Sequence, residues 1–262
     1  MIGNKPSIYN AQSVYNQGGG SGTFDVDLGG GVSQTIVFPP YLVPVEFIDS
    51  SNYTGSGLCI LGASQIEKTN DYKIKTKIAP NKLSMGANDE QILKICSAFK
   101  SSDSYYYYNV KLIPNSDSIT IQYANNSHQF DYLDFGKEMI IGFDCSSRTQ
   151  SIKYVNGQTI SHQDSRSFGY GNFGTWSFFN SFSISSGTMF RGKLYGTILY
   201  KLDEIKALFV PARAKNQNDT KPYIVDCVSG SVGVNCGDDS TTNGLTFGPD
   251  IDLSEEIPGW IT

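Results

Sequence analysis

The 262-residue sequence lacks the features that mark several large protein classes. Only 17% of its residues are charged and the net charge is −5, so it has no basic surplus of the kind that nucleic-acid-binding proteins carry. No apolar run approaches the roughly 20 residues that a membrane-spanning helix needs. The first residues also lack the apolar centre of a secretion signal. We therefore predict a chain assembled in a cytoplasm, with neither nucleic acid nor a membrane as its partner.

The sequence is equally poor in catalytic and metal-binding motifs. It holds two histidines, His128 and His162, and neither has a His, Cys or carboxylate partner at metal-ligand spacing. We predict that both are exposed loop residues. No Gly-x-Ser-x-Gly nucleophile motif occurs, and Gly29-Gly30-Gly31 lacks the lysine of a phosphate-binding loop. We predict no catalytic residue, no metal and no cofactor.

The cysteines do not form a disulfide or metal framework. There are five of them, and no Cys-x-x-Cys pair occurs. Most lie inside apolar, strand-like runs, which favours free, buried thiols that pack as small hydrophobic groups. The alternative is a disulfide between Cys227 and Cys236, across the glycine-rich turn that separates them.

What the sequence has in abundance is glycine (27), tyrosine (16) and phenylalanine (15). Aromatic and β-branched runs between Gly, Asn, Asp and Ser turns predict an all-β protein. The clearest run is 71–78, where Ile74, Thr76 and Ile78 share one face and the lysines between them share the other. We predict a half-buried strand whose lysines discourage pairing at a sheet edge. Further strands are expected at 24–28, 105–112, 118–123, 138–144, 151–157, 176–184 and 189–200, while 90–99 fits a short helix or a strand.

Residues 1–23 differ from the rest of the chain and contain a short repeat. Ser-Ile-Tyr-Asn at 7–10 returns as Ser-Val-Tyr-Asn at 13–16, six residues later. On an extended chain Ile8 and Val14 face one way and Tyr9 and Tyr15 the other, whereas on a helix the copies would diverge. We predict an extended arm that grips a surface through these four residues, followed by a glycine-rich linker. The alternative is a disordered tail.

The closing third of the chain has a specific order of elements. Gly192-Lys193-Leu194-Tyr195 opens a hairpin whose second run ends in Leu-Phe-Val-Pro at 208–211, and Tyr223 then precedes Asp226 and a Ser-Gly turn. Pro211 is expected to end the second run, since proline cannot donate to a ladder. This order resembles the closing strands of a concanavalin A-like (laminin-G-like) jelly roll found in structural proteins of tailed phages of gut bacteria, the crAss-like phages among them. Residues 138–157, with the turn dipeptide Asn156-Gly157, and the proline-rich segment 39–49, expected to be an edge strand, resemble further elements of that family.

The resemblance implies a jelly-roll sandwich of two antiparallel sheets over residues 24–250, between the arm (1–23) and a C-terminal tail (251–262). It also implies a non-enzymatic virion protein, a head fibre or capsid decoration protein, that docks on capsid or other virion proteins through its arm. A homotrimer is expected, because three arms multiply weak docking.

A carbohydrate-binding lectin or tail receptor-binding module is the alternative function. Sugar sites combine exposed aromatic side chains with loop amides, and the segment around 169–174 is the most loop-like of the aromatic stretches. Its residues Tyr170, Asn172 and Phe173, with Trp176, are the candidate glycan-binding residues, although aromatic residues in a sandwich are commonly core. A glycosidase is disfavoured, because the Glu-x-Asp-x-x-Glu pattern of jelly-roll hydrolases is missing.

Overall fold

The computed structural model describes fifteen segments of the chain. They are residues 22–27, 33–53, 60–62, 72–81, 90–97, 107–113, 118–123, 126–130, 136–145, 150–155, 158–163, 173–179, 188–201, 204–235 and 244–253. None of them is helical, so this part of the chain offers no helix that could cross a membrane.

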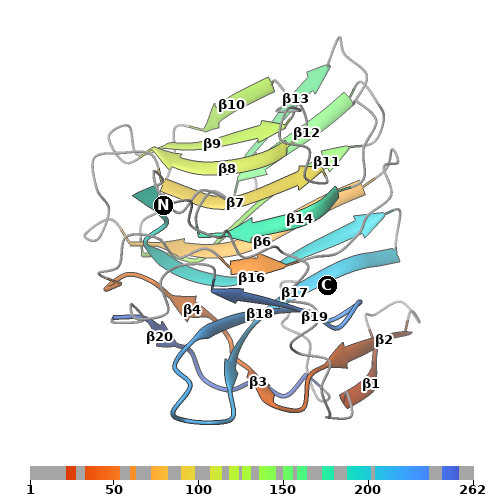
Figure 1. Ribbon diagram of the computed structural model, residues 1–262. Helices are drawn as coiled ribbons and strands as arrows, with labels where there is room; N and C mark the ends of the chain where they lie inside the picture. The colour runs from red at the N-terminus through yellow and green to blue at the C-terminus, as the bar shows by residue number, and fades with distance from the viewer. Residues whose placement is uncertain are drawn as a thin grey trace, which may run out of the picture.

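The described residues form twenty strands (Figure 1). In chain order they are β1 (Gly22–Asp27), β2 (Ser33–Phe38), β3 (Leu42–Pro44), β4 (Ile48–Asp49), β5 (Ile60–Gly62), β6 (Tyr72–Pro80), β7 (Glu90–Ser97), β8 (Tyr107–Ile113), β9 (Ser118–Tyr123), β10 (Asn126–Phe130), β11 (Met139–Cys145), β12 (Gln150–Val155), β13 (Gln158–Gln163), β14 (Phe173–Phe178), β15 (Thr188–Met189), β16 (Gly192–Lys201), β17 (Glu204–Ala214), β18 (Pro222–Asp226), β19 (Ser231–Asn235) and β20 (Thr246–Phe247).

Strand pairing builds an antiparallel jelly-roll sandwich. One layer has the order β13-β12-β11-β6-β16-β17, and the other β18-β19-β5-β14-β7-β8-β9-β10. Strand β17 joins the layers, because its first half pairs with β16 and its second half with β18. Every pairing between the described strands is antiparallel except the short one of β15 with β7. Figure 1 shows the two layers, with β10 and β13 together at the top.

The sandwich interior lies between the two layers and is filled by the apolar side chains that alternate along the strands. Ile74 and Ile78 of β6 point inward with Thr76, as the sequence pattern predicts. Phe178 of β14 meets Phe209 of β17 with ring centroids 5.2 Å apart, so these two rings join the layers. Thr76 also faces Thr197 of β16, and their buried hydroxyls share a hydrogen bond of 2.9 Å, so neither is left unsatisfied.

A second apolar cluster, the outer core, lies on the opposite face of β16 and β17. Successive residues of a strand point to opposite sides, so Leu208 faces away from the sandwich interior while Phe209 faces into it. The β1–β2 hairpin forms a separate two-stranded sheet that covers the outer core with its buried Ile36 and Phe38. The outer core consists of Ile36, Phe38, Leu42, Ile198, Ile205, Leu208, Val210, Ala212, Ala214, Tyr223, Val225, Cys227 and Leu253.

The start of β16 is a tight crossing of chains that requires glycine. Gly192 has φ of +145°, and a Cβ there would lie 2.4 Å from the carbonyl oxygen of Ala79. Beside it, the fully buried Ser50 donates its hydroxyl to the carbonyl of Phe190 at 2.7 Å. The glycine of the closing-strand pattern therefore permits close packing of β16 against β6.

The structure confirms several sequence predictions and corrects others. Residues 90–97 form a strand, and 138–144 and 151–157 contain the predicted hairpin of β11 and β12. Strand β6 pairs on both sides, with β11 and β16, so the prediction that its lysines protect a sheet edge is wrong. The predicted strand at 189–200 is divided, because Phe190 and Arg191 separate β15 from β16. The edge strand expected over 39–49 is divided into β3, which pairs with β17 among the described strands, and β4, which pairs with both β16 and β20 and so is not at an edge.

Pro211 does not end the second run of the closing hairpin. Strand β17 continues to Ala214, with Pro211 opposite Ile224 of β18. The ladder with β16 reaches only Phe209, so no β16 carbonyl requires the donor that proline lacks. On that side the carbonyl of Pro211 instead accepts a hydrogen bond from the amide of Val45 at 3.0 Å. Proline is therefore tolerated at the point where β17 passes from one layer to the other.

Candidate functional site

The closing strands are organised around the buried carboxylate of Asp226. One of its oxygens accepts the amides of Leu208 at 3.0 Å and Val228 at 3.1 Å, and the other accepts the hydroxyl of Ser229 at 2.6 Å. Gly230, with φ of +71°, completes the turn from β18 to β19. The aspartate of the Tyr223–Asp226 pattern thus joins β17 to this turn and is fully inaccessible to solvent. Its role is structural, since no ligand can reach it.

The lysine row of β6 forms part of an ordered outer face. Lys77 binds Glu138 at 2.6 Å and lies 4.4 Å from the ring centroid of Tyr195. The hydrogen bond from the Lys77 ammonium holds the pKa of the Glu138 carboxyl below its usual value. Burial, and then the hydrogen bond to Glu138, raise the pKa of the Tyr195 phenol. Lys77, Glu138 and Tyr195 thus bind one another, so few of their polar atoms remain available to a ligand.

The same face continues onto β4 and β16 through aromatic contacts. Lys193 lies 4.0 Å from the ring centroid of Phe47, whose ring meets Tyr195 edge-on at 5.3 Å. Lys75 lies 5.6 Å from the ring centroid of Tyr200. Each lysine covers an aromatic ring, an arrangement that shields the rings and stabilises the sheet. The lysine face predicted to be solvated is therefore packed at Lys75 and Lys77, whereas the side chain of Lys73 is 52% exposed, as predicted.

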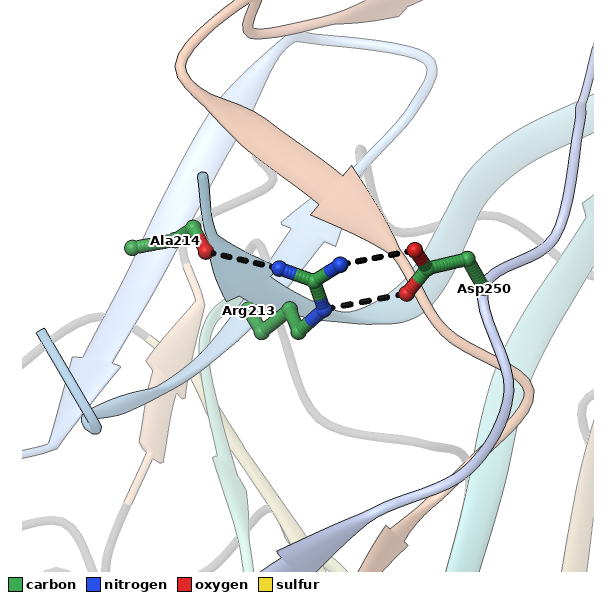
Figure 2. Close-up of polar contacts among 3 residues, drawn as sticks. All are labelled: Arg213, Ala214 and Asp250. Carbon is green, nitrogen blue, oxygen red and sulfur yellow. Dashed lines mark hydrogen bonds and ion pairs between the residues drawn. The ribbon is translucent and has the colours of Figure 1, made fainter. Parts of the chain in front are cut away.

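A segment from the C-terminal end of the chain is fastened across β3 and β4. This C-terminal segment (244–253) pairs through β20 with β4, and its Ile251 amide donates to the carbonyl of Pro44 at 3.0 Å. Arg213 grips Asp250 with two hydrogen bonds, Nε at 2.9 Å and Nη2 at 2.7 Å, and its Nη1 donates to the carbonyl of Ala214 (Figure 2). Asp250 in turn raises the pKa of Arg213. No sequence signal links these partners, because they lie 37 residues apart.

The segment extends beyond the boundary predicted for the folded domain. The tail is expected to begin at residue 251, yet Leu253 is 2% exposed and belongs to the outer core. Packing therefore continues at least to Leu253.

The structure places only part of the predicted glycan-binding group. Phe173 and Trp176 lie in β14, which pairs with β5 and β7, and Trp176 stands opposite Gly62 and Ile95. The loop expected through 174 therefore gives way to a strand at Phe173. Tyr170 and Asn172 lie outside the described residues, as do Ile8, Tyr9, Val14 and Tyr15 of the arm. The binding roles of both groups stay predictions.

The histidines and the described cysteine have simple positions. His128 lies in β10 opposite Ile121, and His162 in β13 opposite Ser151, so the prediction that both are loop residues is wrong. Each belongs to a strand of a hairpin, where ladder pairing holds a polar sequence extended. Cys227 is a free, fully buried thiol, as predicted, and burial raises its pKa well above the usual value. Within the described ranges no three His, Cys, Asp or Glu side chains gather as a metal site would require.

Comparison with known proteins gives distant structural likenesses. No protein-family model and no curated protein matches the chain. A solved structure of domains LG4-5 of the mouse laminin α1 chain is 14% identical with a TM-score of 0.45; the match covers 69% of this chain and 47% of that one, so this protein spans about half of it. The SAP-like pentraxin of Limulus polyphemus is 12% identical, with a TM-score of 0.46 and coverage of 80% and 94%. The CBM40 of the Ruminococcus gnavus IT-sialidase is 11% identical, with a TM-score of 0.41 and coverage of 60% and 90%.

Proposed function

We propose that this protein is a non-enzymatic structural protein of a tailed-phage particle, a head fibre or capsid decoration protein, which displays its sandwich for adhesion to host or gut glycans. The observation that supports it is the closing-strand pattern of residues 192–237. Three of its residues have defined structural roles in the sandwich. Gly192 allows β16 to pass close to β6, the ring of Phe209 packs between the two layers, and Asp226 holds the turn from β18 to β19. The resemblance to phage structural proteins thus rests on the residues that build this fold.

The arm of residues 1–23 is the proposed anchor on capsid or other virion proteins. It leads directly into β1 at Gly22, and β2 is secured to the body. The amide of Val37 donates to the carbonyl of Cys227 at 2.7 Å, and Gln34 donates its side-chain amide to the carbonyl of Ile205 at 3.1 Å. Force on the arm would therefore reach the sandwich through a hairpin that is hydrogen-bonded to it. In the proposed homotrimer, three such arms raise the effective concentration of each docking contact.

Cryo-electron microscopy of the particle tests the anchor. The truncation should remove residues 1–21 only, because Gly22 already pairs with Phe38 in the hairpin. We expect particles that assemble without sandwich density, while the truncated protein keeps its melting temperature. A milder pair of variants separates the side chains: Tyr9→Ala with Tyr15→Ala should lose occupancy, and Asn10→Ala with Asn16→Ala should keep it. Intact particles that never contain the protein would refute the virion role.

The lectin alternative predicts a different result. A lectin would bind glycan as an isolated monomer and would not need residues 1–21. Binding of the truncated protein to a glycan array, with no association of the full chain with particles, would favour that reading. If the protein hydrolysed a polysaccharide, and substitution of a single carboxylate abolished this activity, the glycosidase hypothesis would instead be supported.

A further inference from the structure

Exposed polar and aromatic residues lie at one end of the β3–β17 ribbon. Leu42 stands opposite Ala214 in that ladder, and the amide of Lys215 donates to the carbonyl of Tyr41 at 2.9 Å, which extends the pairing by one residue. Leu42 and Ala214 are buried in the outer core, so alternation directs Tyr41 and Lys215 to the solvent side. Figure 1 shows β3 beside the connection from β17 to β18 at the lower end of the molecule.

Tyr41 is the one large apolar residue in the described part of the chain that is exposed, at 37%. It follows Pro39 and Pro40 in a turn closed by the amide of Leu42, which donates to the carbonyl of Pro39 at 3.1 Å. Proline fixes its own backbone angle, and a rigid group loses little entropy when it binds a partner. An aromatic ring is thus presented on an ordered support.

The neighbouring loop presents amide groups on an equally ordered backbone. The side-chain oxygen of Asn216 accepts the amide of Asn218 at 3.1 Å. The two carboxylate oxygens of Asp219 accept the amide of Lys221 at 3.1 Å and the hydroxyl of Tyr223 at 2.7 Å. These bonds fix the backbone, and the exposed side chains of Lys215, Gln217 and Asn218 make no hydrogen bond or ion pair to any other described residue.

The ion pair of Figure 2 belongs to the same face. Arg213 lies two residues before Lys215, which directly follows β17 and continues its pairing with Tyr41, so both side chains point to the same side. Asp250 neutralises Arg213 through two hydrogen bonds and is still 53% exposed, so its carboxylate can accept further bonds. We call the group Tyr41, Arg213, Lys215, Gln217, Asn218 and Asp250 the end surface.

We propose that the end surface is a binding site for a neutral glycan. A tyrosine ring offers a flat apolar face to the C–H face of a sugar, and amides both donate to and accept from hydroxyl groups. Rigid tyrosine beside asparagine-type amides is a recurrent combination in binding surfaces. The charges of this region largely balance, which favours a neutral ligand. Asp250 pairs with Arg213, and the carboxylate of Asp219, which accepts hydrogen bonds from two uncharged groups and so keeps its charge, lies four residues from the ammonium of Lys215.

This inference rests on the adhesion part of the proposed function, and a glycan array with the full-length protein tests it. The probes are α-mannan, β-glucan and desialylated mucin O-glycans, with polysialic acid as the charged counterpart. We expect binding to at least one neutral probe, and a loss of roughly tenfold or more in affinity for Tyr41→Ala, the equivalent of about 1.4 kcal/mol. Tyr41→Phe, which keeps the ring, should retain most of the affinity.

The amides have their own variants. Gln217→Ala with Asn218→Ala should weaken binding several-fold, because it removes two amides that can bond to sugar hydroxyl groups. The loop itself should keep its shape, because these side chains take no part in its own hydrogen bonds. Lys73→Ala, on the distant outer face of β6, should bind like the wild type. Thermal melts of every variant exclude misfolding as the cause of a loss.

Each contrary outcome has a distinct meaning. Glycan binding that survives Tyr41→Ala and the double amide variant would overturn this site and leave adhesion elsewhere on the molecule. Stronger binding to polysialic acid than to the neutral probes would overturn the ligand class. A wild-type protein that binds no probe would overturn both the site and the adhesion role, whereas the virion role would still be decided by the arm truncation.

Discussion

The sandwich interior and the outer core are both dry and apolar, yet they are assembled in different ways. The interior joins two layers of strands, most of which are held by ladders on both sides, as β6 is by β11 and β16. The outer core instead closes one face of β16 and β17 with short pieces: a two-stranded hairpin, β3 and the C-terminal segment. We infer that the interior sets global stability, while the hairpin opens in separate, smaller fluctuations.

The strongest test of this comparison is Phe209→Ala. The substitution deletes the ring that meets Phe178 across the layers, and we expect a loss of about 3–5 kcal/mol in the free energy of unfolding, measured with urea. In native-state hydrogen exchange the Thr76 amide should lose protection by the same amount. The Val37 amide, which exchanges when the hairpin opens, should be unchanged. Parallel losses at both amides would show that the two regions unfold as one unit.

Asp226→Ala should have the next largest effect, because Asp226 links β17 to the turn after β18. The substitution leaves the amides of Leu208 and Val228 without their acceptor, and hydrogen bonds to a charged group are typically worth about 1.5–3 kcal/mol. We expect a loss of roughly that size in the free energy of unfolding. Asp226→Asn keeps one acceptor oxygen in place and should cost less. A loss no greater than that of a surface substitution would show that these hydrogen bonds add little to stability.

More of the sandwich interior than of the outer core could be predicted from the sequence, and the reason is physical. Strand β6 carries its pattern within nine residues, and the partners of a hairpin such as β11 and β12 are close along the chain. The outer core draws on residues from Ile36 to Leu253, and the pieces that cover β16 and β17 are short. Alternation cannot tell which outward-facing positions another segment will cover, so the burial of Ile198, which stands opposite Lys75 of β6, could not be predicted.

The candidate sites show the same contrast between features that lie within one stretch of sequence and features that distant segments build together. Aromatic content indicated a region around 170–176, but local sequence could not show that Phe173 and Trp176 enter a strand. The end surface was missed because its members come from three separate segments, at Tyr41, 213–218 and Asp250. The ladder of β3 with β17 brings Tyr41 beside the loop that follows β17, and local sequence does not reveal such a pairing.

Ile36→Val sharpens the comparison with a smaller change. Loss of one buried methyl group should destabilise docking of the hairpin by about 1 kcal/mol. The Val37 amide should then exchange roughly five times faster, the factor that corresponds to this free energy. Val43→Ala, at a half-buried position on the opposite face of β3, provides a control for methyl loss outside the outer core. An unchanged rate at Val37 would mean that the hairpin does not open by leaving the outer core.

The smallest expected effect concerns the outer face of β6, where Lys77 binds Glu138. The carboxyl pKa is lowered in the folded protein, so the ion pair adds stability at neutral pH, and this contribution is lost as the pH falls through the lowered pKa. Glu138 is 52% exposed, so we expect Glu138→Gln to cost less than about 1 kcal/mol at pH 7. Glutamine can still accept the Tyr195 hydroxyl, so the substitution isolates the charge. The stability difference from the wild type should shrink toward zero in acid and in 1 M salt, whereas a difference that persists below the lowered pKa would point to packing against Tyr195 as its cause.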